Sequence, residues 1–259
     1  MLGLIRALSH NGQLAIAGPL RRHAVRAAVQ LNDPPLLART ITALDVPRVL
    51  FFRESGETDC ELVGAAERLL RELPSGDHPL RCRLLTTLAI ELEDAATTRG
   101  YDASAQAVTM ARGLGDPVLL AMSLIGRWTQ SFRSGGPDER LRIGGELLMV
   151  SGKPATAEAA AQAMLMAASC GTADFRAADW HAAEAARIAE RYQLPTIEAA
   201  VGLYRAMRTA LNGNPRAAER YREAAGQLSR FGLRVHAVAV DSVAASALLI
   251  MQGRAPVCR

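Results

Sequence analysis

The octet Leu31-Asn-Asp-Pro-Pro-Leu-Leu-Ala38 is repeated almost letter for letter as Leu114-Gly-Asp-Pro-Val-Leu-Leu-Ala121. An aspartate followed by a proline suits the start of a helix, because the carboxylate caps free backbone N–H groups and proline needs no hydrogen bond in the first turn. The duplication therefore predicts that one structural unit recurs along the chain, with a helix starting at each copy.

Prolines in comparable settings recur at intervals of about 45, 38, 37 and 41 residues, at Pro34, Pro79, Pro117, Pro154 and Pro195. These intervals are typical of repeats made of helical hairpins. The periodicity predicts helices over residues 58–73, 79–97, 102–114, 117–132, 137–151, 155–170, 174–192, 196–211, 215–231 and 234–252. Because the links are short, consecutive helices should be antiparallel neighbours. We therefore expect an all-α, right-handed α-solenoid of about five or six helix pairs.

Composition supports the all-α prediction. Hydrophobic residues make up 49% of the chain but aromatic residues only 4%, and alanine supplies much of the difference. Alanine favours helix and lets helices approach closely. No stretch alternates long enough at period two to predict a strand.

We expect a single helical-repeat domain over residues 1–259, in which residues 56–252 form the stacked pairs and 253–259 a tail. Residues 1–55 are less regular. They should contain a frayed hairpin over 1–18, a short amphipathic helix over 21–31 and, over 45–55, either a short strand or, as we favour, an irregular connector.

Charge and cysteine content exclude several classes of protein. The net charge is only +4, and 26 acidic residues are mixed among 30 basic ones, which is unlike a dedicated nucleic-acid binder. Cys60, Cys82, Cys170 and Cys258 form no CxxC pair, so neither a metal site nor a disulfide framework is expected. No signal peptide or membrane-spanning stretch stands out. We expect a soluble cytoplasmic protein without a cofactor or membrane partner.

Two later segments resemble the second helix of a tetratricopeptide repeat, in which small residues stand where paired helices touch. One is Gly213-Asn-Pro215 followed by Ala218, Tyr221 and Ala225, and the other is Asp174-Phe175 followed by Ala178 and Ala185. The recurring proline is similar to the one that closes such a repeat. The resemblance implies tetratricopeptide-like hairpins of a divergent, longer type, with these four alanines buried.

A second set of segments consists of Leu31-Asn-Asp-Pro34, Asp45-Val-Pro47, Leu80-Arg-Cys-Arg-Leu-Leu85, Ala111-Arg-Gly-Leu-Gly-Asp-Pro-Val-Leu-Leu-Ala121 and Gln252-Gly-Arg254. These segments resemble the C-terminal helical-repeat region of large actinobacterial transcription regulators, the Streptomyces antibiotic regulatory protein type and its ATP-binding relatives. In that family the DNA-binding and nucleotide-binding domains precede such repeats. This chain has no GxxxxGK[ST] loop, and its one lysine, Lys153, lies in a predicted turn. The resemblance implies a sensory or protein-interaction module that is not an enzyme and does not itself contact nucleic acid.

The inner face of a solenoid is its usual binding surface, lined by the first helix of each hairpin. If Gly126 lies at the hairpin contact, helical spacing places a set of polar residues on that face: Arg83, Thr86, Ser123, Arg127, Gln130 and Arg205. Arginines suit anionic groups, because the guanidinium donates two parallel hydrogen bonds. These residues are predicted to bind a small effector or an extended peptide. A homodimer is a further possible assembly.

Two other classes stay open. A self-standing enzyme would use Asp179 with His181, or Glu91, as acid–base groups in the groove, although residues two apart on a helix face different ways. A bare protein scaffold is the other alternative. Nothing in the sequence matches a known nucleophile motif.

Overall fold

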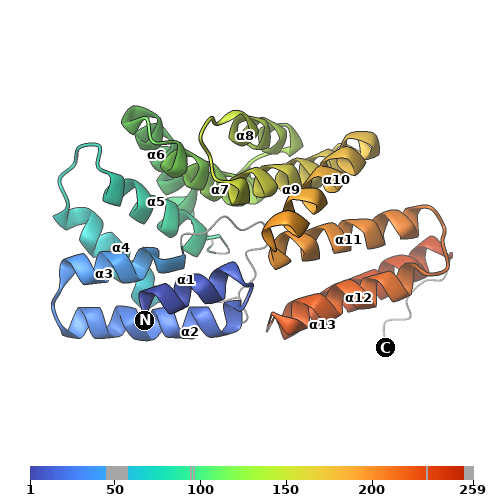
Figure 1. The fold of residues 1–259 in the computed structure, drawn as a ribbon, viewed down its shortest axis with the longest axis horizontal. Helices are drawn as coiled ribbons and strands as arrows, with labels where there is room; N and C mark the ends of the chain where they lie inside the picture. The colour runs from blue at the N-terminus through green and yellow to red at the C-terminus, as the bar shows by residue number, and fades with distance from the viewer. Residues whose placement is uncertain (45–57, 94, 96, 232, 254–259) are drawn as a thin grey trace.

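The computed structural model describes residues 1–44, 58–93, 95, 97–231 and 233–253 (Figure 1). All regular structure in these residues is helical, so the all-α prediction is confirmed. The elements are α1 (Leu2–His10), α2 (Leu14–Gln30), α3 (Pro34–Ile41), the 3-10 helix η1 (Thr42–Leu44), α4 (Cys60–Glu72), α5 (Pro79–Glu91), α6 (Arg99–Leu114), α7 (Pro117–Ser134), α8 (Pro137–Met149), α9 (Ala155–Gly171), α10 (Phe175–Tyr192), α11 (Pro195–Leu211), α12 (Ala217–Arg230) and α13 (Arg234–Met251). The connector predicted over residues 45–55 lies outside the described residues.

The repeated aspartate–proline pair starts a helix at both of its positions. The Asp33 carboxylate accepts a hydrogen bond of 2.9 Å from the Leu36 N–H, and the Asp116 carboxylate accepts one of 2.8 Å from the Val118 N–H. The proline after each aspartate is the first residue of α3 or α7. The predicted capping role of Asp33 is therefore confirmed, and α5, α8 and α11 also begin at a proline.

The N-terminal region is more regular than predicted. The second arm of the expected hairpin and the expected helix over residues 21–31 form one helix, α2, which continues through Pro19. Proline removes a hydrogen bond inside a helix. Pro19 itself is exposed, while Ala17, Ala24 and Ala28 bury the opposite face of α2. Burial of that face keeps the helix continuous past the proline.

Consecutive helices pack on one another along the chain, and α9 lies between α8 and α10 (Figure 1). The buried residues follow chain order, with one cluster drawn from α2 to α5, a second from α4 to α7 and a third from α6 to α11. The helices after Pro117 and Pro154 are in contact, as the repeat prediction requires. The described chain is thus a series of stacked helices.

The alanine seams are only partly as predicted. Ala178 and Ala185 are fully buried and Ala225 is 7% exposed. Ala218 is exposed, however, and the neighbouring Ala217 is buried instead. The prediction for Ala218 was wrong, because at the start of α12 it is Ala217 that takes the buried position.

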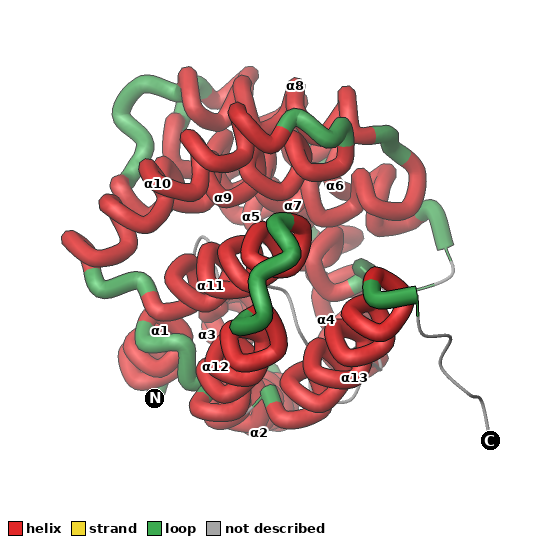
Figure 2. Tube along the Cα trace, turned by 90° about the vertical axis from the view of Figure 1, so that its right-hand side faces the viewer, coloured by secondary structure: helices red, strands yellow, loops and turns green. Residues whose placement is uncertain are grey.

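The two ends of the stack meet. The turn between α1 and α2 lies against α11 and the turn between α12 and α13, as the two views show (Figures 1 and 2). Leu14 belongs to the same buried cluster as Leu228 and Leu233. A Cβ atom on Gly12 would lie only 3.1 Å from the Phe231 ring. The series of helices therefore closes on itself through an apolar contact between residues far apart in the sequence.

Candidate functional site

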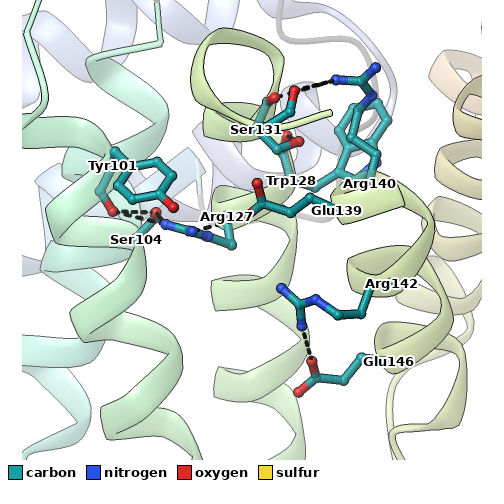
Figure 3. A network of polar contacts seen from close by, with 10 residues as sticks. Tyr101, Ser104, Arg127, Trp128, Ser131, Glu139, Arg140, Arg142 and Glu146 are labelled. Carbon is teal, nitrogen blue, oxygen red and sulfur yellow. Dashed lines mark hydrogen bonds and ion pairs between the residues drawn. The ribbon is translucent and has the colours of Figure 1, made fainter. Parts of the chain in front are cut away.

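Arg127 joins three helices from its position on α7 (Figure 3). Its Nη2 donates to Glu139 Oε1 of α8 at 2.9 Å, and its Nη1 lies 3.4 Å from the Tyr101 carbonyl and from Ser104 Oγ of α6. The guanidinium carbon lies 3.6 Å from the centre of the Tyr101 ring, which is cation–π geometry. The Arg127 and Glu139 side chains are only 13% and 21% exposed. The Arg127 charge is therefore neutralised within the protein, where it holds α6, α7 and α8 together.

Trp128 and Phe132 form an aromatic pair next to the Arg127 network, and Figure 3 labels Trp128 of this pair. Trp128 is buried and meets Phe132 edge to face, with ring centres 4.6 Å apart. Phe132 is 55% exposed, and the Arg140 guanidinium lies 4.9 Å from its ring centre. Among the described residues, the buried Trp128 indole N–H finds no hydrogen-bond partner.

Three of the predicted binding residues lie between α5 and α7. Thr86 and Ser123 share a hydrogen bond of 3.0 Å between their hydroxyls, and Gln130 Nε2 donates to the Ala89 carbonyl at 2.6 Å. All three side chains are at most 2% exposed. Gly126 does lie at this helix contact, since a Cβ atom there would be 3.4 Å from the Thr86 methyl. The polar residues share the face of Gly126, but α5 covers that face, so a ligand would reach them only by separating two helices.

The two remaining predicted binding residues lie elsewhere. Arg83 is half-buried on α5, one turn before Thr86, and Arg205 is exposed on α11. The structure therefore divides the predicted set between a buried helix contact, the Arg127 network and an exposed arginine. Their role in binding stays a prediction, and Arg205 is the member that solvent reaches freely.

The rival acid–base group Asp179 belongs to a structural cluster between α10 and α11. Arg208 donates to both carboxylate oxygens of Asp179 at 3.0 Å, and the Tyr204 hydroxyl also donates to it. The Arg208 and then the Tyr204 hydrogen bonds hold the pKa of Asp179 below its ordinary value. Burial, followed by the bond to Asp179, raises the pKa of Tyr204. Asp179 thus stays ionised and Tyr204 stays protonated, which suits a fixed helix contact rather than proton transfer.

His181 and Glu91 have other partners. His181 Nδ1 lies 2.7 Å from Gln162 Oε1 on α9, and burial lowers the pKa of the imidazole. His181 therefore contacts α9 while Asp179 contacts α11, as expected for residues two apart on a helix. Glu91 pairs with Arg21 of α2, and both side chains are 7% exposed. The three candidate acid–base groups lie in separate interhelical contacts.

Glu139 and Arg208 were not singled out by the sequence. Glu139 follows Arg127 by 12 residues and Arg208 follows Asp179 by 29. Neither separation places the pair on one helix face, so no local pattern reveals them. Only the packing of adjacent helices brings the two members of each pair together.

A comparison with protein-family models finds no match, and no curated protein matches the sequence. Among the described residues, no helix is both long and apolar enough to cross a bilayer. Nor does that part of the chain bring together three or more His, Cys, Asp or Glu side chains that could hold a metal ion.

Proposed function

We propose that this chain is a non-catalytic sensory or protein-interaction module of a transcription regulator, built as a right-handed solenoid of tetratricopeptide-like hairpins and acting in the cytoplasm. The observation that carries the proposal is the serial packing of neighbouring helices throughout the described residues. Stacked helical hairpins create extended binding surfaces without requiring any catalytic group. The resemblance of the repeated segments to regulator repeats supplies the biological context.

The contacts of the candidate acid–base groups support a non-catalytic role. A general acid or base needs a proton that it can exchange with a substrate, and a pKa near the working pH. Asp179 is held ionised by Arg208 and Tyr204, and its pKa is moved away from neutrality. His181 is hydrogen-bonded to Gln162, and Glu91 is paired with Arg21.

The proposed ligand is a small anionic effector or a peptide with an acidic group. The exposed Arg205 is open to such a group, whereas Arg127 would first have to exchange its bond to Glu139. Next to Arg127, the exposed Phe132 ring offers an apolar contact. Arg127 and Arg205 are therefore assigned to anion binding, and Phe132 to an apolar part of the ligand.

Native mass spectrometry of the purified chain tests this proposal. We expect a small molecule or peptide that stays bound under native conditions and is lost on unfolding. The double variant Arg127→Ala/Arg205→Ala should weaken its binding by at least about tenfold, whereas Arg187→Ala, an exposed arginine on α10, serves as the matched control. Unchanged affinity in the double variant would contradict the assignment of the site.

Two results would overturn the function itself. One is turnover of a substrate that disappears in the variant His181→Ala, which would make the chain an enzyme. The other is sequence-specific DNA binding by the 259-residue chain alone, since the proposal places DNA reading in other segments. Both are measured on the same purified protein, by product analysis and by a salt-controlled binding assay.

A further inference from the structure

The last described helix, α13, packs on α12 through one apolar seam. Leu233, Ala237 and Ala244 are buried along this seam, and Val240 is partly buried. Their spacing of four, three and four residues is that of one face of an α-helix. This inward seam accounts for how α13 is held in the stack.

A second apolar seam with the same spacing runs along the opposite side of α13. It consists of Ala239, Val243, Ser246 and Ile250, all of which are exposed. Val243 is 69% and Ile250 is 63% exposed. Between Ala237 and Met251 the only charged residue is Asp241. A helix that is apolar all round is normally buried on both sides, so the outward seam has the character of an interface.

We propose that the outward seam of α13 docks, antiparallel, against the same seam of a second copy of this chain. An antiparallel register that sets Ala239 opposite Ile250 also sets Val243 opposite Ser246. Each large side chain then meets a small one, and a two-fold axis makes the fit reciprocal. A parallel pair would instead place Ala239 against Ala239 and Ser246 against Ser246, which leaves gaps without van der Waals contact.

The polar atoms of the seam do not oppose this burial. The Ser246 hydroxyl donates to the Ser242 carbonyl of its own helix at 3.0 Å, so it needs no water in the interface. In the same register Asp241 faces Leu248, not a second Asp241, so like charges are kept apart. One helix pair is smaller than a standard protein interface, and we therefore expect a reversible dimer with a Kd of about 1–100 μM.

The chemistry of the seam favours a second copy over other partners. An anionic lipid surface or a nucleic acid would require clustered lysine or arginine side chains on this face. The described side chains of the seam carry none. A surface that fits the outward seam must itself be uncharged and apolar, with large and small side chains placed in the same way as in the seam.

Sedimentation velocity over a concentration series tests the dimer. The wild-type chain should pass from monomer to dimer, and Val243→Glu and Ser246→Arg should each weaken dimerisation by at least about tenfold, because each buries an unpaired charge. An equimolar mixture of the two variants should recover dimers, since the antiparallel register sets the new acidic and basic groups opposite one another. Met149→Glu, at an 80% exposed apolar position on α8, should leave dimerisation unchanged.

Circular dichroism of each variant provides the folding control, and both substituted side chains are exposed in the monomer. A wild-type chain that stays monomeric throughout the series would overturn the proposal, whether or not it binds lipid vesicles or DNA. A dimer that Val243→Glu does not weaken, or that the mixture does not restore, would do so as well. This inference does not depend on the proposed sensory function, which each of these outcomes leaves unchanged.

Discussion

The contact between the two ends of the stack predicts that Gly12→Ala is unusually destabilising. Gly12 has φ +72°, and a Cβ atom there would lie 3.1 and 3.2 Å from two carbons of the Phe231 ring. Gly115 provides a matched control, because it has φ +65° and no atom within 4 Å of its Cβ position. Both substitutions require the left-handed conformation, but only one meets a distant part of the chain.

The expected magnitudes follow from these two terms. Holding alanine in the left-handed region costs about 1–2 kcal/mol at either position. Carbon atoms prefer separations of about 3.5–4.0 Å, so at Gly12 the Phe231 ring must also move by a few tenths of an ångström. Overpacking of this kind adds about 1–3 kcal/mol. We expect Gly12→Ala to lower the free energy of unfolding by about 2–5 kcal/mol, and Gly115→Ala by about 1–2 kcal/mol.

Urea denaturation followed by circular dichroism measures both values. Repeating the comparison in a Phe231→Ala background forms a double-mutant cycle, in which the excess cost of Gly12→Ala should disappear. The cycle separates the energy of the contact between residues 12 and 231 from the cost of the left-handed backbone conformation, because that cost is the same in both backgrounds. Equal costs for Gly12→Ala and Gly115→Ala would refute the closure of the stack.

Three other substitutions test the interior. Glu91→Leu should lower the free energy of unfolding, measured by urea denaturation, by about 3–5 kcal/mol, because it leaves the buried Arg21 charge without its carboxylate. A decrease below about 1 kcal/mol would mean that water reaches this ion pair. Ala178→Leu should lower the free energy of unfolding by about 1–3 kcal/mol, and Ala218→Leu, at an exposed position, by less than about 0.5 kcal/mol. Equal decreases would contradict the burial of Ala178. The pKa of Asp179 is lowered, first of all by its hydrogen bond with Arg208. The ionised carboxylate therefore stabilises the folded protein above the unfolded pKa of about 3.9, and this contribution is lost as the pH falls through the folded pKa. Asp179→Asn should therefore flatten the decline in melting temperature below about pH 4, and an unaltered decline would count against the cluster.

The starts of the helices were predictable because their causes are local. Asp33 and Asp116 cap backbone groups only two or three residues away, and the proline beside each restricts its own backbone. Such interactions form whatever surrounds the helix. The same reasoning failed at Pro19, where burial of the far side of α2 outweighs the local preference of proline to break a helix.

The exposure of polar residues was not predictable in the same way. Helical spacing predicted that Ser123 and Gln130 point away from the core into the groove, but α5 buries both of them, because spacing contains no information on what covers a helix face. Thr86, which bonds Ser123, comes from a helix that lies 37 residues earlier in the chain. Ala218 is exposed although Ala225, two turns later on the same helix, is buried as predicted, so spacing alone did not show where the buried face of α12 begins.

The closure and the outward seam of α13 use different sides of the same helix. Leu14 shares a buried cluster with Leu233 and Ala237 of the inward seam, whereas Val243 and Ile250 belong to the outward seam. Contacts without shared partners contribute independently to stability. A second copy can therefore dock on α13 without opening the contact between the ends, and loosening that contact need not weaken the dimer. α13 thus contributes to two apolar contacts, one within the chain and one between chains.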